Sequence, residues 1–135
     1  MLPLKLDLPA RPQPAAPLST GDAALLDSLR AVAMSCRVKP RADLFHACAL
    51  LHGDRSASQA AHAEALMRCL AQALGQPARL HAPGAAELTF DETWLLALGR
   101  AAARGDEGSV AFLLGRRVAA EHRRLVRFLI RRIVA

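Results

Sequence analysis

The chain has 135 residues, a length typical of one domain of about a hundred residues or more with a tail. Hydrophobic residues make up 53% of it and charged residues 22%, which excludes a disordered or low-complexity protein for most of the chain. The formal net charge of +6 is unevenly placed: residues 1–115 hold 11 basic and 11 acidic side chains, whereas residues 116–135 hold seven arginines against Glu121 alone. Any electrostatic function is therefore expected in the last twenty residues.

Apolar segments and cysteine usage also indicate where in the cell the protein is expected. No apolar run approaches the ~20 residues that a transmembrane helix needs, and no charged flank followed by an apolar run marks a signal peptide. The three cysteines are an odd number without CxxC spacing, which is typical of reduced thiols. We therefore expect a cytoplasmic protein with no transmembrane segment.

Residues 1–18 hold five of the eight prolines and predict a Pro-rich leader. Leu2, Leu4, Leu6 and Leu8 alternate with other residues, which would place four leucines on one side of an extended segment. Two alternatives remain open, a disordered leader and a strap that packs on its own domain or on a partner.

Two helices are expected next. Apolar residues at steps of three and four predict an amphipathic helix over 21–37, which Pro40 ends. Asp43 is a suitable N-cap for a short second helix that stops at Gly53. Both spacings indicate helices with one buried face.

A third helix and a long connection follow. Ser56 and Gln59 have the spacing of a capping box and predict a helix that Gly75 ends. Residues 76–88 are rich in proline and glycine and predict a loop.

Three further helices complete the chain. Thr89 and Glu92 form a second capping-box pattern, for a helix that ends at Gly105. Helical spacing then predicts a short helix over 106–114 and a final one over about 117–134. The fold class is therefore all-α: a compact bundle of five to six helices, in a single domain over 19–135 behind the leader.

The final helix is the most informative segment. At 100° per residue, one face is apolar and the opposite face is rich in arginine. The apolar face holds Val118, Ala119, Leu125, Val126, Leu129, Ile130 and Ile133, with His122 in its middle. The opposite face holds Arg116, Arg117, Arg123, Arg124, Arg127 and Arg131, and Phe128 lies outside the apolar face. These six arginines and Phe128 form the candidate interaction surface.

Four interpretations of this helix remain open. It closes the bundle with a solvated arginine face, or it follows the phosphates of a nucleic acid, or it lies in a membrane interface, or it binds a protein partner. No zinc-finger spacing, RNA-recognition aromatics or convincing helix-turn-helix supports the nucleic-acid interpretation.

A metal site is a weaker candidate. Cys48 and His52 are four residues apart on the second predicted helix, and His62 and Cys69 are seven apart on the third. Two thiolates and two imidazoles suit tetrahedral zinc, but the spacing matches no known zinc motif, and free cysteines are often simply buried small hydrophobic residues. We expect no bound metal.

No pattern predicts catalysis. The serines lack a Gly-x-Ser-x-Gly context, no glycine-rich run suits a phosphate, and the acidic residues lie at predicted helix starts, where carboxylates act as caps. We therefore expect a non-enzymatic protein without a cofactor. The first hypothesis is helix-mediated protein contact, through self-association as a homo-oligomer or in an adaptor or regulatory role. The alternative is a nucleic-acid-associated factor that uses the arginine face.

Overall fold

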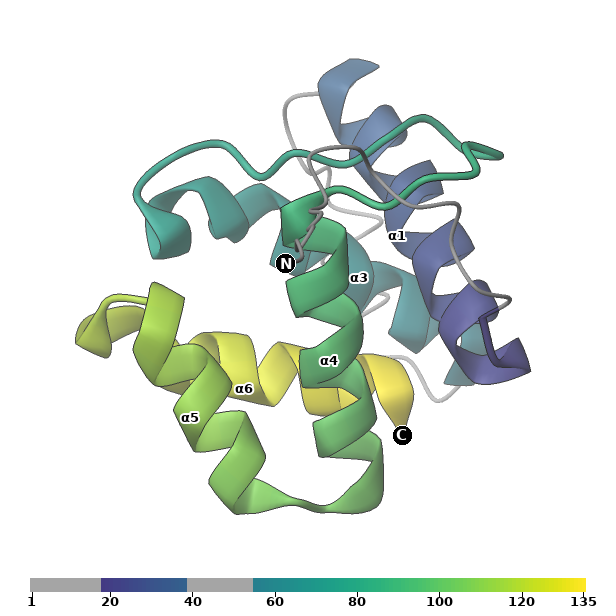
Figure 1. Cartoon of the computed structure of the whole chain (residues 1–135). Coiled ribbons are helices and arrows are strands. Elements are labelled where there is room, and N and C mark those ends of the chain that lie inside the picture. Colours follow the sequence, from purple (N-terminus) through teal and green to yellow (C-terminus); the bar gives the residue numbers. More distant parts are fainter. Residues whose placement is uncertain (1–17, 39–54) are drawn as a thin grey trace, which may run out of the picture.

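The computed structural model describes residues 18–38 and 55–135, and in this part of the chain all regular structure is helical. The helices are α1 (Thr20–Val38), α3 (Arg55–Leu74), α4 (Phe90–Arg104), α5 (Glu107–Arg117) and α6 (Ala120–Val134) (Figure 1). The all-α prediction is confirmed. The leader up to residue 17 and the short helix expected from Asp43 to Gly53 lie outside the described residues.

The helices pack around α4 and α6. Figure 1 shows α4 crossing in front of α6, with α5 on one side and α1 on the other. The packed pairs are α3 with α6 and α1, α4 with α5, α6 and α1, and α5 with α6. The connection over residues 75–89 runs across the top of the bundle from α3 to α4.

Each of the five helices contributes to one hydrophobic core. Leu29 of α1, Leu66 of α3, Leu95 of α4, Leu114 of α5 and Ile130 of α6 are all at most 1% exposed. Burial of this apolar surface provides the main free energy that holds the helices together. None of the described helices is long and apolar enough to cross a membrane.

Both ends of α4 and the start of α5 follow the predicted local signals. Thr89 and Glu92 form the capping box in both directions, and Gly105 ends α4 in the left-handed conformation with φ 72°. Asp106 then caps α5 by accepting from the backbone N–H of Ser109, 3.1 Å away. These caps are predicted correctly because each depends on residues within four positions of one another.

The capping box predicted for α3 is wrong. The helix already begins at Arg55, so Ser56 lies inside it and cannot be its N-cap. Gln59 instead donates through Nε2 to the carbonyl oxygens of Ile133, at 3.2 Å, and Ala135, at 2.9 Å. The side chain thereby binds the last carbonyls of α6, a tertiary contact across 74 residues or more.

The boundary between the last two helices also differs from the prediction. α5 continues through Gly115 to Arg117, since glycine inside a helix costs only ~1 kcal/mol. Val118 and Ala119 are extended, with ψ of 130° and 145°, and α6 begins at Ala120. Val118 is 2% exposed, and the N–H of Ala119 donates to the carbonyl oxygen of Ala73 in α3. Tertiary packing therefore sets the bend.

Candidate interaction surface on α6

The six arginines of the predicted surface do not share one helix. Arg116 and Arg117 end α5, whereas the other four lie on α6. Because Val118 and Ala119 are extended, the rotation of 100° per residue is interrupted between the two groups. The prediction of one helix over 117–134 is therefore wrong, and so is the common arginine face that depended on it.

Arg117 is an internal contact between α5 and α4. Its side chain is 14% exposed, and Nη2 lies 2.7 Å from Oδ1 of Asp91. Its guanidinium carbon is 4.9 Å from the ring centre of Phe90 and 5.1 Å from that of Trp94. An ion pair and two cation–π contacts hold this arginine against α4, so it is not a free phosphate ligand.

Two arginines of α6 are also used within the chain. Arg123 donates through Nε to the carbonyl oxygen of Val118, 2.8 Å away, and so binds the bend before α6. Arg131 forms an ion pair with Glu107 at the start of α5. Both side chains link α6 to the preceding segment.

Within the described residues, the remaining three arginines of the predicted surface form no ion pair. Arg116 is exposed and lies 5.7 Å from the ring centre of Phe112. Arg124 is exposed, whereas Arg127 is half-buried and its Nε is shielded from solvent without a hydrogen-bond partner. The row of six arginines is thus reduced to three, which are divided between two helices.

The aromatic side chains have an unusual distribution. Phe90, Phe112 and Phe128 are 74%, 62% and 53% exposed, so each phenylalanine in the described residues is exposed. Trp94 is buried and donates through Nε1 to the carbonyl oxygen of Leu113, 3.0 Å away. Phenylalanine is normally a core residue, and exposed aromatic side chains are the usual anchors of protein interfaces.

Phe128 belongs to a continuous stripe on α6. Glu121, Leu125, Phe128 and Arg132 follow one another at steps of four, three and four residues, and all four are exposed. At 100° per residue they lie within an arc of about 60°. We name these four residues the α6 stripe.

The α6 stripe points away from the core. The residues of α6 that enter the core are Val126, Leu129, Ile130 and Ile133, and their common direction is about 120° from the stripe. Leu125, predicted to face inward, is 46% exposed and Ala119 is also exposed, so the predicted apolar face is too wide. Phe128, which the sequence pattern places outside the apolar face, is 53% exposed, and His122 is half-buried.

The charges of the stripe match the polarity of the helix. Glu121 lies in the first turn of α6 and Arg132 in the last turn. A carboxylate near the N-terminus and a guanidinium near the C-terminus are both favoured by the helix dipole. The stripe is therefore acidic at one end, apolar in its middle and basic at the other end.

His62 of α3 borders the stripe. Its ring centre is 5.7 Å from that of Phe128, with an angle of 57° between the rings. Nδ1 of His62 lies 2.6 Å from the carbonyl oxygen of Ser58, a distance at which the ring donates to the backbone. This hydrogen bond fixes the ring against which Phe128 rests.

The structure brings no metal site together in its described part. Cys48 and His52 lie outside the described residues, and no group of three or more His, Cys, Asp or Glu side chains elsewhere has a metal-binding arrangement. The Sγ of Cys69 lies 3.4 Å from the carbonyl oxygen of Leu66. Burial raises the pKa of the Cys69 thiol, which disfavours the thiolate that zinc requires.

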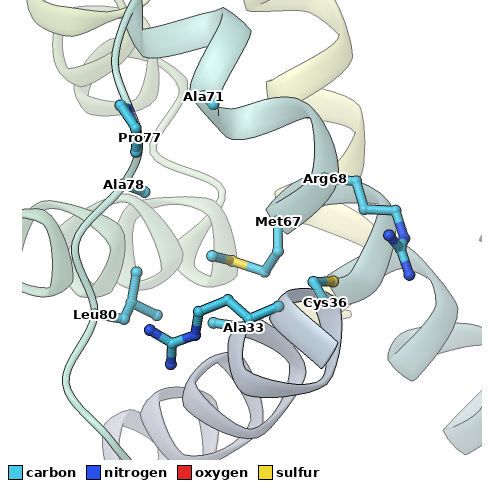
Figure 2. Close-up of a pocket in the computed structure, with 9 residues that line it drawn as sticks. Ala33, Cys36, Met67, Arg68, Ala71, Pro77, Ala78 and Leu80 are labelled. Atoms are coloured by element: carbon cyan, nitrogen blue, oxygen red, sulfur yellow. The ribbon is translucent and has the colours of Figure 1, made fainter. Parts of the chain in front are cut away.

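A shallow groove of about 310 Å³ lies between α1, α3 and residues 77–80. Figure 2 shows Met67 directed into it, with Leu80 opposite and with Cys36 and Arg68 on the other side. Burial raises the pKa of the Cys36 thiol, and Arg68 is paired with Glu64 at 2.7 Å. The thiol is therefore a poor nucleophile, and this basic side chain is already neutralised.

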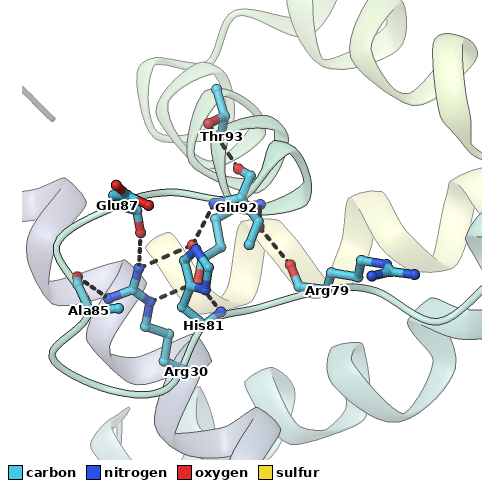
Figure 3. Close-up of polar contacts among 8 residues, drawn as sticks. Arg30, Arg79, His81, Ala85, Glu87, Glu92 and Thr93 are labelled. Carbon is cyan, nitrogen blue, oxygen red and sulfur yellow. Dashed lines mark hydrogen bonds and ion pairs between the residues drawn. The ribbon is translucent and has the colours of Figure 1, made fainter. Parts of the chain in front are cut away.

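An ion pair shielded from solvent lies at the N-terminus of α4. Nε and Nη2 of Arg30 lie 2.7 and 3.1 Å from the two carboxylate oxygens of Glu92, while Nη1 and Nη2 donate to the carbonyls of Ala85 and Glu87 (Figure 3). Glu92 also accepts from the N–H groups of Thr89 and His81. These contacts fix the connection over residues 75–89 in place, a structural role.

The sequence did not reveal the pairing of Arg30 with Glu92. Burial raises the pKa of the Glu92 carboxyl, but hydrogen bonds from Arg30, Thr89 and His81 outweigh it and hold that pKa below its ordinary value. The hydrogen bond between Arg30 and Glu92 in turn raises the pKa of Arg30. Only the capping role of Glu92 could be read from local spacing, because its partner lies on a distant helix.

Comparison of the chain with protein-family models, with curated proteins and with solved structures finds no match.

Proposed function

We propose that this protein is a small, non-catalytic helical protein that works by helix-mediated contact with another protein chain, and that the α6 stripe is the contact surface. The observation that carries the proposal is the exposure of two large apolar side chains beside each other, Leu125 at 46% and Phe128 at 53%. They lie three residues apart on α6, about 120° from the direction in which this helix enters the core.

The physical argument rests on the cost of this exposure. Full burial of an apolar side chain is worth roughly 1.5–3 kcal/mol, and about half of that surface still faces water at Leu125 and Phe128. Contiguous exposed apolar residues with charged neighbours are typical of interaction sites. The cytoplasmic location expected from the cysteine content is part of the same proposal.

The arrangement of the arginines favours a protein partner over a nucleic acid. Arg117, Arg123 and Arg131 are held by Asp91, Val118 and Glu107. Six arginines on one face would give a salt slope of about −5 for duplex binding, whereas Arg116, Arg124 and Arg127 alone would give about −3. Anisotropy of a labelled mixed-sequence duplex, titrated at several salt concentrations, measures this slope. A slope near −5 would favour the nucleic-acid alternative.

Photo-cross-linking tests the proposed contact directly. A photoreactive phenylalanine analogue at position 128 of the full-length protein, expressed in the cells of its natural host, should cross-link to a protein chain. The matched control carries the same analogue at position 112, where Phe112 is 62% exposed on α5. Protein cross-links from position 112 alone would contradict the assignment to α6, and no cross-link from either position would refute the proposed function.

A further inference from the structure

We infer that the partner of the α6 stripe is a second copy of this chain, bound with the two α6 helices antiparallel. The inference rests on the proposed function and names its partner. The two-fold axis would pass between the two helices, level with the midpoint between Val126 and Arg127 and so with the middle of the stripe.

The order of residues in the stripe carries this inference. About that axis, Glu121 lies opposite Arg132 of the second copy, and Leu125 lies opposite Phe128 of the second copy. Symmetry forms each contact twice, so two ion pairs flank two apolar contacts. A single two-fold axis therefore gives each of the four exposed residues a partner of matching chemistry, so the stripe is complementary to itself.

Within one chain this ion pair cannot form. Glu121 and Arg132 are eleven residues apart on a straight helix, which separates them by about 16 Å along its axis. A parallel arrangement would instead place Glu121 opposite Glu121 and Arg132 opposite Arg132, and like charges across an interface repel. The distribution of charge thus selects the antiparallel orientation.

The charges beside the stripe are consistent with this packing. Arg124 and Arg131 lie along one edge of it, and Arg124 of each copy would approach Arg131 of the other. Arg131 is already paired with Glu107, and Arg124 lies three residues from Glu121, at the spacing of neighbours on a helix surface. Only part of the repulsion between these arginines therefore remains.

Other occupants fit the charge pattern less well. The phosphates of a nucleic acid would meet Glu121 inside the surface, and an acidic helix would place a like charge against the same residue. The ion pairs with a second copy leave neither Glu121 nor Arg132 unpaired. Self-complementarity is the property that distinguishes this stripe from a general basic surface.

The size of the contact predicts a weak dimer. α6 has 15 residues and is about 22 Å long, so one pair of such helices buries an area at the low end of specific interfaces. We expect a dissociation constant in the micromolar range, with the monomer folded on its own core.

Charge reversal tests the inference on the full-length protein. Sedimentation equilibrium between about 5 and 500 μM should show wild-type protein associating toward twice its mass of 14.4 kDa. Glu121→Arg and Arg132→Glu should each weaken association at least tenfold, because each places like charges opposite one another. An equimolar mixture of the two variants should recover it, since both ion pairs form again between unlike chains.

The control variant is Arg116→Glu, an exposed charge reversal on α5 that should leave association unchanged. Recovery in the mixture also shows that the single variants are folded. A wild-type protein that is monomeric at every concentration, single variants that still associate, or a mixture that fails to recover would each overturn the inference. A monomer whose position 128 still cross-links to a different protein would overturn only the inference, whereas the absence of both signals would also remove the proposed function.

Discussion

Arg30 of α1 and Glu92 of α4 are 62 residues apart in the sequence, yet Nε of Arg30 lies 2.7 Å from Oε2 of Glu92. The two side chains are 2% and 0% exposed. A buried ion pair is stabilising only when its remaining donors and acceptors are satisfied. Here the carbonyls of Ala85 and Glu87 accept further hydrogen bonds from the guanidinium. One arginine therefore connects α1, the segment over residues 75–89 and the first turn of α4.

Arg30→Met should destabilise the protein strongly. The substitution keeps an apolar stem but leaves the carboxylate of Glu92 buried without its cation, which typically costs about 3–5 kcal/mol. Urea unfolding measures the loss. Arg100→Met is the control, because Arg100 is 47% exposed in its pair with Asp22 and should cost less than about 1 kcal/mol. Equal losses in both variants would contradict the structural role of Arg30.

Stability should decrease in acid because of Glu92. Its pKa in the folded protein lies below the ordinary value of 4.5, so the folded state binds fewer protons than the unfolded state between these two values. The contribution is therefore fully present above the ordinary pKa and is lost as the pH falls through the folded one. Urea midpoints from about pH 6 to 3 should decrease steeply for the wild type and less steeply for Glu92→Gln. Parallel curves would assign the acid sensitivity to other groups.

Arg116 and Arg117 are neighbours in the sequence, but substitution of each should have a different effect on stability. Arg117→Gln removes the ion pair with Asp91 and the contacts with Phe90 and Trp94, a loss of about 1–3 kcal/mol, whereas Arg116→Gln should stay within about 0.5 kcal/mol. Trp94 is the only tryptophan, so its emission should shift in the first variant alone. Equally small losses of stability and an unshifted Trp94 emission in both variants would indicate that both arginines lie in solvent.

Two aliphatic residues of α6 provide a further comparison. Ile130→Ala should cost about 2–5 kcal/mol, because Ile130 is 0% exposed and its truncation leaves a cavity. Leu125→Ala should cost less than about 1 kcal/mol in the monomer, since Leu125 is 46% exposed. Thermal unfolding at low protein concentration measures both values without a contribution from association. A large cost for Leu125→Ala would place that residue in the core and remove it from the stripe.

The candidate site was only partly predictable. Phe128 stood out because it broke the apolar pattern of α6, and the spacing of Glu121, Leu125 and Arg132 is visible in the sequence once the helix is known. Its significance required two further facts, the start of α6 at Ala120 and the direction of the core. Without them, Leu125 was assigned to the buried face.

Local signals in the amino-acid sequence were enough to predict the all-α class, the helix bounds near Thr89, Gly105 and Asp106, and the excess of positive charge near the end of the chain. These features depend on caps, turns and periodicity within a few residues, and local chemistry is sufficient for them. Only the tertiary structure decided the bend at Val118, the partners of Arg30 and Arg117, and which side of α6 remains exposed. Those features depend on which helices, distant in the sequence, pack against one another. The hydrophobic periodicity of one helix does not indicate which other helices it contacts.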